Sequence, residues 1–292
     1  MLNLLEHPHL FDGGLARAMA YLALALILGQ LYWRHRLQQG PAWGWLVWFL
    51  GTTGMLLALN SIWLSVSTAN GGQASDSSML DMLSTQFTRA WLMYWLGLCL
   101  SLWLLRRIPW LSLLSAIAML LAMGLSAHAG EAGALHLIFW LDVLHMGLAL
   151  LWLGSLSLML LSRLSSPDAE ITHPISASTA AHSPARAPIG LDDLKRFSML
   201  ALPLFITILL SGLARLGLGW EENAGFAFTY AMMLLFKLCA VLGVMLCAWH
   251  LRKLLRHRPF SGKQFDNGLS AEYFLALLLL LFTSLLTQLS PG

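Results

Sequence analysis

A small group of polar residues stands at the start of an apolar segment that is long enough to cross a membrane. The segment 137–161 carries Asp142, His145 and Met146, and His136 comes directly before it. Asp142 and His145 are three residues apart, so they share one face of a helix. At about 1.5 Å per residue, His145 would lie roughly 12 Å inside its span. Ionisable side chains at such a depth are costly to bury and are usually functional.

Imidazole and thioether groups together form the ligand set of a copper site. Thioether is a soft ligand that selects Cu(I), whereas imidazole binds either oxidation state of copper. An aspartate one turn from a histidine could also fix the tautomer of that histidine. The alternative for each methionine is simple packing against its neighbours. The candidate metal ligands are His128, His136, Asp142, His145, Met123 and Met146.

One lysine stands near the middle of a later apolar segment. Lys237 lies within 228–250, where an unpaired ammonium group is costly and needs a partner. Asp142, at comparable depth, is the candidate partner, and the pair would either tie two helices together or balance charge along a cation path. Met233, one turn before Lys237, would lie on the same path. The charges expected to form a separate solvated cluster at the span ends are Arg215, Glu221 and Glu222.

The elements that must position these residues are transmembrane helices. The chain is 58% hydrophobic and only 11% charged, whereas a soluble domain has about 25% charged residues. Apolar runs long enough for the bilayer recur along the whole chain, which predicts an all-α polytopic membrane protein. The eight predicted spans are 15–33, 43–66, 88–105, 109–126, 137–161, 196–218, 228–250 and 270–289.

The basic residues predict the orientation of these spans. Most of the 17 Lys and Arg fall in the loops after the first, third, fifth and seventh spans. By the positive-inside rule these loops face the cytoplasm, and both termini face outward. The opposite loops are acidic, so the outer face should attract cations. We find no nucleotide-binding, protease or kinase motif, and we expect neither an enzyme nor a partner of nucleic acid.

A polar stretch divides the chain into two parts. Residues 166–194 are rich in Ser, Ala, Pro and Thr, a composition typical of a flexible linker, which the orientation places in the cytoplasm. The part before it, 1–165, would contain five helices and the metal site. The part after it, 195–292, would contain three helices, and together they would form one membrane domain.

Several motifs resemble the membrane copper resistance and copper import proteins of the CopD type. The pattern D-x-x-H-x(6)-W-x-G is formed by Asp142, His145, Trp152 and Gly154. The resemblance covers roughly 126–161 and 194–291. Its C-terminal residues are Arg196, Phe197, Ser198, Ala201, Ser211, Gly212, Thr229, Tyr230, Lys237, Glu272, Thr287 and Pro291.

The resemblance implies an eight-helix protein of the bacterial inner membrane that handles copper beside a small periplasmic protein of the CopC type. It would place His128 and His145 on the metal path. We therefore expect copper to arrive from the periplasm and to pass inward between the fourth, fifth and seventh spans. Two alternatives stay open: a membrane electron-transfer protein that holds haem b between histidines, and a non-transporting subunit that senses metal or stabilises a partner.

Overall fold

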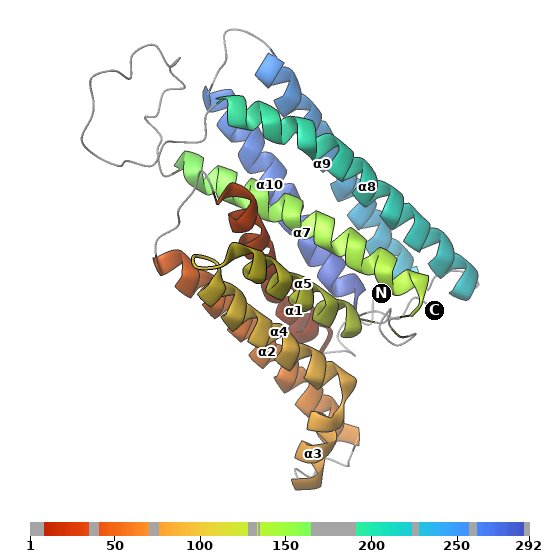
Figure 1. Cartoon of the computed structure of the whole chain (residues 1–292). Coiled ribbons are helices and arrows are strands. Elements are labelled where there is room, and N and C mark those ends of the chain that lie inside the picture. The colour runs from red at the N-terminus through yellow and green to blue at the C-terminus, as the bar shows by residue number, and fades with distance from the viewer. Residues whose placement is uncertain are drawn as a thin grey trace.

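The chain folds into long helices packed side by side (Figure 1). A computed structural model describes residues 9–34, 41–69, 76–127, 133, 135–164, 191–223, 228–256 and 262–288, and these contain no strand. The helices are α1 (His9–Trp33), α2 (Pro41–Ala69), α3 (Asp76–Ser84), α4 (Gln86–Leu104), α5 (Pro109–Leu125), α7 (Leu137–Leu164), α8 (Leu191–Asn223), α9 (Phe228–Arg256) and α10 (Gly262–Leu286).

The predicted all-α membrane architecture is confirmed. Six of the described helices, α1, α2, α7, α8, α9 and α10, are long and apolar enough to cross a bilayer, and α5 is a shorter apolar helix. Each of the eight predicted spans overlaps one helix, with α4 and α5 as the two short cases. That all eight cross the membrane, and which end faces outward, remain predictions.

Three boundaries differ from the sequence prediction. The region after α2 contains a short helix, α3, which contacts α2 and α4 instead of forming only a loop. Helix α8 begins at Leu191, inside the predicted linker. Asp192 and Asp193 lie in its first turn, where their negative charges stabilise the positive end of the helix dipole. Helix α10 begins at Gly262, and its first turns carry Asp266, which pairs with Arg163 at 2.9 Å. Residues 165–190 of the linker lie outside the described residues.

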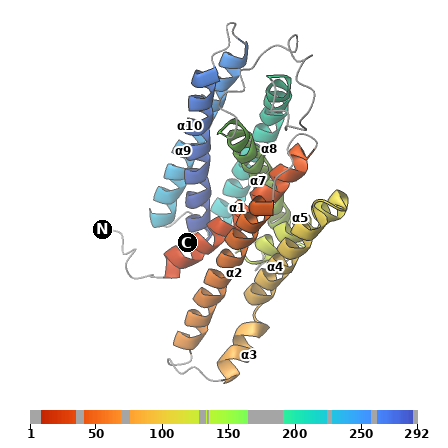
Figure 2. The same cartoon turned by 90° about the vertical axis from the view of Figure 1, so that its left-hand side faces the viewer.

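Helices α1 and α7 lie at the centre of the bundle. Helix α7 contacts α1, α5, α8 and α10, and it runs between the group formed by α2, α4 and α5 and the group formed by α8, α9 and α10 (Figures 1 and 2). Most residues of the α1 and α7 spans are buried, whereas α8 and α9 bury few. The outer surfaces of α8 and α9 are therefore the natural faces for lipid.

Small residues let α1 and α7 approach backbone to backbone. A Cβ atom at Gly29 would collide with the backbone of Gly154, and one at Gly154 would collide with the carbonyl of Ala25. Ala25 and Gly29 are four residues apart, the small-xxx-small spacing of close helix pairs in membranes. Gly154, which belongs to the D-x-x-H-x(6)-W-x-G pattern, thus fixes the position of the helix that carries His145.

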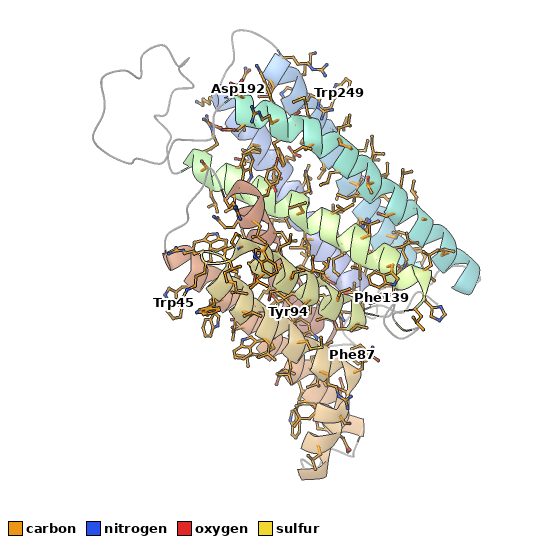
Figure 3. The ribbon with its side chains drawn as sticks, viewed as in Figure 1. Trp45, Phe87, Tyr94, Phe139, Asp192 and Trp249 are labelled. Atoms are coloured by element: carbon orange, nitrogen blue, oxygen red, sulfur yellow. The ribbon has the colours of Figure 1, made fainter. Side chains whose placement is uncertain are left out.

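Polar side chains inside the bundle bind the backbone of neighbouring helices. Tyr94 of α4 donates to the carbonyl of Ala20 on α1 at 2.9 Å. Trp33 of α1 donates through Nε1 to the carbonyl of Ser155 on α7 at 3.1 Å. Figure 3 shows Tyr94 within the bundle, whereas Trp45 and Trp249 project from it. Because hydrocarbon offers no hydrogen bonds, such contacts fix which helices are neighbours.

Because α1 and α7 approach so closely, a bulky side chain at Gly154 should destabilise the protein more than one at a glycine with free space around it. Gly154→Leu should lower the thermal stability of the purified protein, by about 1–3 kcal/mol or more, because overpacking pushes the two backbones apart. Fluorescence-detected size exclusion after heating measures this loss. Gly44→Leu is the control, since nothing lies within 4 Å of a Cβ at Gly44. Equal stability of the two variants would contradict the packing described here.

Candidate metal site

His145 lies in a polar seam between α7 and α8. Its Nδ1 atom is 2.9 Å from the carbonyl oxygen of Ile208 and 3.1 Å from Oγ of Ser211. Gly212 gives the ring room, because a Cβ atom there would lie 3.0 Å from Cε1 of His145. Ile208, Ser211 and Gly212 fall on one face of α8, at spacings of three and four residues. The ring is therefore held by a single turn of α8.

The hydrogen bonds of this seam define the tautomer of His145. A carbonyl oxygen only accepts, so the contact with Ile208 requires the proton of the ring to sit on Nδ1. Ser211 donates its own hydroxyl proton to the same carbonyl at 3.0 Å. A neutral imidazole with its proton on Nδ1 presents the lone pair of Nε2, as a histidine bound to metal does when a backbone carbonyl holds its other nitrogen.

Asp142 pairs with Arg215 of α8 rather than with Lys237. Nε of Arg215 donates to Oδ1 of Asp142 at 3.0 Å. The predicted direct ion pair of Asp142 and Lys237 is thus wrong. Arg215, which we expected in a solvated cluster with Glu221 and Glu222, pairs with Asp142, and the side chains of Glu221 and Glu222 lie outside the described part of the chain. The reason is packing order: α7 lies against α8, whereas α9 packs mainly on α10. The tautomer of His145 is therefore set by its hydrogen bond to the carbonyl of Ile208 and not by Asp142.

Lys237 stands apart from this pair but within its electrostatic range. It is half-buried in α9 and forms no ion pair within 4 Å with any residue that the structure describes. Its charge nevertheless acts on both Asp142 and His145. A mobile cation at Nε2 of His145 would therefore meet a positive charge on the neighbouring helix.

The other predicted ligands are distributed around α7. Met146 follows His145 and packs partly buried against the core, and Met233 is half-buried on α9. Met123 is fully buried on α5, whose contacts reach the face of α7 that carries Val143 and Gly147. His136 is exposed before the first turn of α7. His128 lies outside the described residues.

No complete metal site is formed by the charged and histidine residues in the described ranges. Nowhere in them do three His, Cys, Asp or Glu side chains converge as a metal ion would require. His145 is the member of the predicted set that hydrogen bonds hold in place, whereas Met146 packs against the hydrophobic core. Further ligands would have to come from methionines or from the segment that contains His128.

The burial of one carboxyl group on α10 was not predicted. Glu272 lies well inside α10, is only 5% exposed, and lines a cavity of about 170 Å³ between α7, α8, α9 and α10. Arg252 lines the same cavity and binds Ser198 of α8. The sequence signal was present, because Glu272 is followed by an apolar run, but the predicted start of the span at 270 placed it at the membrane edge.

The α8 side of the seam lies in a region of the chain that matches a known protein family. Residues 191–286 match the family described as copper resistance protein D, CopD. The matched region contains α8, α9 and α10, and hence the turn of α8 that holds His145, but not His145 itself. No curated protein and no solved structure shows a significant match to the chain.

The ion pair between α7 and α8 predicts energetic coupling across the seam. Asp142→Asn and Arg215→Gln should each destabilise the protein, and the double variant should lose less than the sum, with a coupling of about 0.5–3 kcal/mol. A double-mutant cycle on thermal unfolding measures it. The matched cycle on Asp192 and Lys195, both exposed on α8, should give a coupling near zero. Additive losses at Asp142 and Arg215 would show that the pair does not hold the seam.

Proposed function

We propose, from the match of residues 191–286 to the CopD family, that this chain transports copper across the bacterial inner membrane. Copper would be accepted on the periplasmic side and moved toward the cytoplasm. The observation that carries the proposal is the hydrogen bond from Nδ1 of His145 to the carbonyl of Ile208. It joins a histidine outside the matched region to a helix inside it, and it directs Nε2 to act as a ligand.

The proposed site binds copper with few and soft ligands. Nε2 of His145 would form its fixed part, and the thioether of Met146 and the imidazole of His128, from the segment that precedes α7, would complete it. A set of imidazole and thioether groups suits Cu(I) and leaves exchange with an incoming carrier possible. A small periplasmic protein of the CopC type is the proposed carrier.

The charges near the site favour passage over storage. Asp142 and Arg215 neutralise each other at 3.0 Å, so neither charge would trap a metal ion. Lys237, which acts electrostatically on His145, would disfavour a resident cation at the same depth. We propose that this repulsion keeps affinity low enough for copper to move on, driven by the copper gradient, the membrane potential or ligand exchange.

His145 should be necessary for copper accumulation. His145→Ala should reduce cellular copper to the level of cells that lack the protein, and elemental analysis of the purified variant should find less copper than in the wild type. His250→Ala is the matched control, because His250 is exposed near the far end of α9, and it should retain both. Unchanged accumulation in His145→Ala at normal expression would reject the proposal. A Soret band in the purified wild type would support the haem alternative instead.

A bulkier side chain placed against the imidazole ring of His145 should weaken copper binding without removing any ligand. Gly212→Val places its side chain against Cε1 of His145 and should displace the ring from the carbonyl of Ile208. Loss of such a supporting contact typically costs about 10–100-fold in metal affinity. Gly217→Val, on the same helix and with nothing within 4 Å of its Cβ, should leave the affinity unchanged. Copper titration with a competing chelator compares them, and equal affinities would show that α8 does not orient the ring.

A further inference from the structure

The buried arginine Arg17 lies at one end of the bundle and is far from His145 in the sequence. Arg17 is only 6% exposed and lies in the second turn of the α1 span. Its Nη2 atom donates to the carbonyl of Ser126 at the end of α5. Its Nη1 atom is buried and has no hydrogen-bond partner among the residues that the structure describes. No carboxylate lies within ion-pair distance of Arg17 among the described residues.

This arrangement is incomplete on physical grounds. The guanidinium group keeps its charge under all ordinary conditions and offers five N–H donors. A buried charge is tolerated when it is paired and hydrogen-bonded, and one neutral carbonyl does not balance it. The missing element is a negatively charged acceptor near Nη1.

Space for such an acceptor lies beside Arg17. A cavity of about 220 Å³ is lined by residues of α1, α2 and α4 and by residues that directly follow α5 and α10. A water molecule occupies roughly 30 Å³ in the liquid, so the cavity has room for a tetrahedral oxyanion and several waters. The residues that line it are Gly13, Arg17, Ala58, Ser61, Ile62, Phe87, Trp91, Ser126, Thr287 and Gln288.

The cavity wall offers donors that nothing in the described part of the chain uses. The hydroxyl groups of Ser126 and Thr287 already donate to the carbonyls of Met123 and Ser284. In contrast, Ser61 and the amide of Gln288 make no side-chain hydrogen bond to the residues that the structure describes. Gly13 makes room for that amide, since a Cβ there would lie 2.6 Å from Oε1 of Gln288. With Nη1 of Arg17, these are three free donors around one space.

We propose that Arg17, Ser61 and Gln288 form a binding site for a phosphate oxyanion. Arginine is the preferred residue for phosphate because its planar donors match two oxygens at once. Most of the lining residues lie near helix ends, and phospholipid headgroups lie where membrane-spanning helices end. The phosphate belongs either to a headgroup or to free phosphate. The site is chemically opposite to the one at His145, since the charge of Arg17 repels metal cations.

Two arms of one experiment test the site and distinguish the sources. In the first arm, native mass spectrometry of the full chain in mild detergent counts retained phospholipids. In the second, the melting temperature of the delipidated chain is measured with sodium phosphate and with sodium chloride at equal ionic strength. Arg17→Gln is the test variant, and Arg89→Gln, which changes an exposed arginine at the same end of the bundle, is the control.

The wild type and Arg89→Gln should retain phospholipid at least twofold more than Arg17→Gln if a headgroup fills the site. If free phosphate fills it, phosphate should raise their melting temperature by several degrees and leave that of Arg17→Gln unchanged. The proposal is overturned if the wild type differs from Arg17→Gln neither in retained phospholipid nor in the effect of phosphate on the melting temperature. It is also overturned if Arg89→Gln loses as much of either response as Arg17→Gln does. If Arg17→Gln is not recovered folded, the double variant Ser61→Ala/Gln288→Leu decides, because it removes two donors and keeps the charge. A wild-type response in that variant overturns the proposal.

Discussion

The hydrogen bond between the imidazole of His145 and the backbone of α8 is the interaction on which the functional account depends. Inside a bilayer a polar side chain has no water to turn to, so its partner must come from a neighbouring helix. Ile208 supplies a carbonyl at 2.9 Å, and Gly212 leaves the space that the ring occupies. This one contact fixes the position of the ring, the nitrogen that carries the proton and the nitrogen that remains for a metal.

The rest of the fold holds α7 in the place where that contact can form. On one side α7 is locked to α1 through Gly154 and Gly29, and Arg163 at its other end pairs with Asp266 of α10. On the opposite side, α7 contacts α8 through the polar seam and the apolar residues beside it. Helices α8 and α9 bury few of their residues. The region that matches the CopD family, α8 to α10, therefore contacts α1 and α7 through α8 and α10 and leaves its remaining faces to the membrane.

The sequence was sufficient to predict the helical class, and residues 191–286, which lie largely within the predicted resemblance, match the CopD family. It was not sufficient to predict which charge meets Asp142. Depth along a span can be counted from the sequence, and depth made Lys237 the candidate partner and placed Arg215 at the end of its span. The order in which helices pack around α7 decided for Arg215, and that order depends on contacts between distant segments, such as the approach of Gly29 to Gly154.

Arg17 and Glu272 show the same limit from another side. A charged residue near the end of an apolar run normally reaches the membrane surface with its long side chain, so sequence position alone did not predict the burial of either. Only the folded chain shows that Arg17 and Glu272 are buried and that each lines a cavity. Helix α3 was missed because its nine residues are too few and too polar for a span.

The most direct test of the account is the state of the two ring nitrogens of His145. Solid-state nuclear magnetic resonance on protein with ¹⁵N-labelled histidine, assigned by comparison with His145→Ala, reports the protonation of each nitrogen. The account predicts a proton on Nδ1, none on Nε2, and a shift of the Nε2 resonance when Cu(I) is added. A proton on Nε2, or an Nε2 resonance that Cu(I) leaves in place, would contradict it.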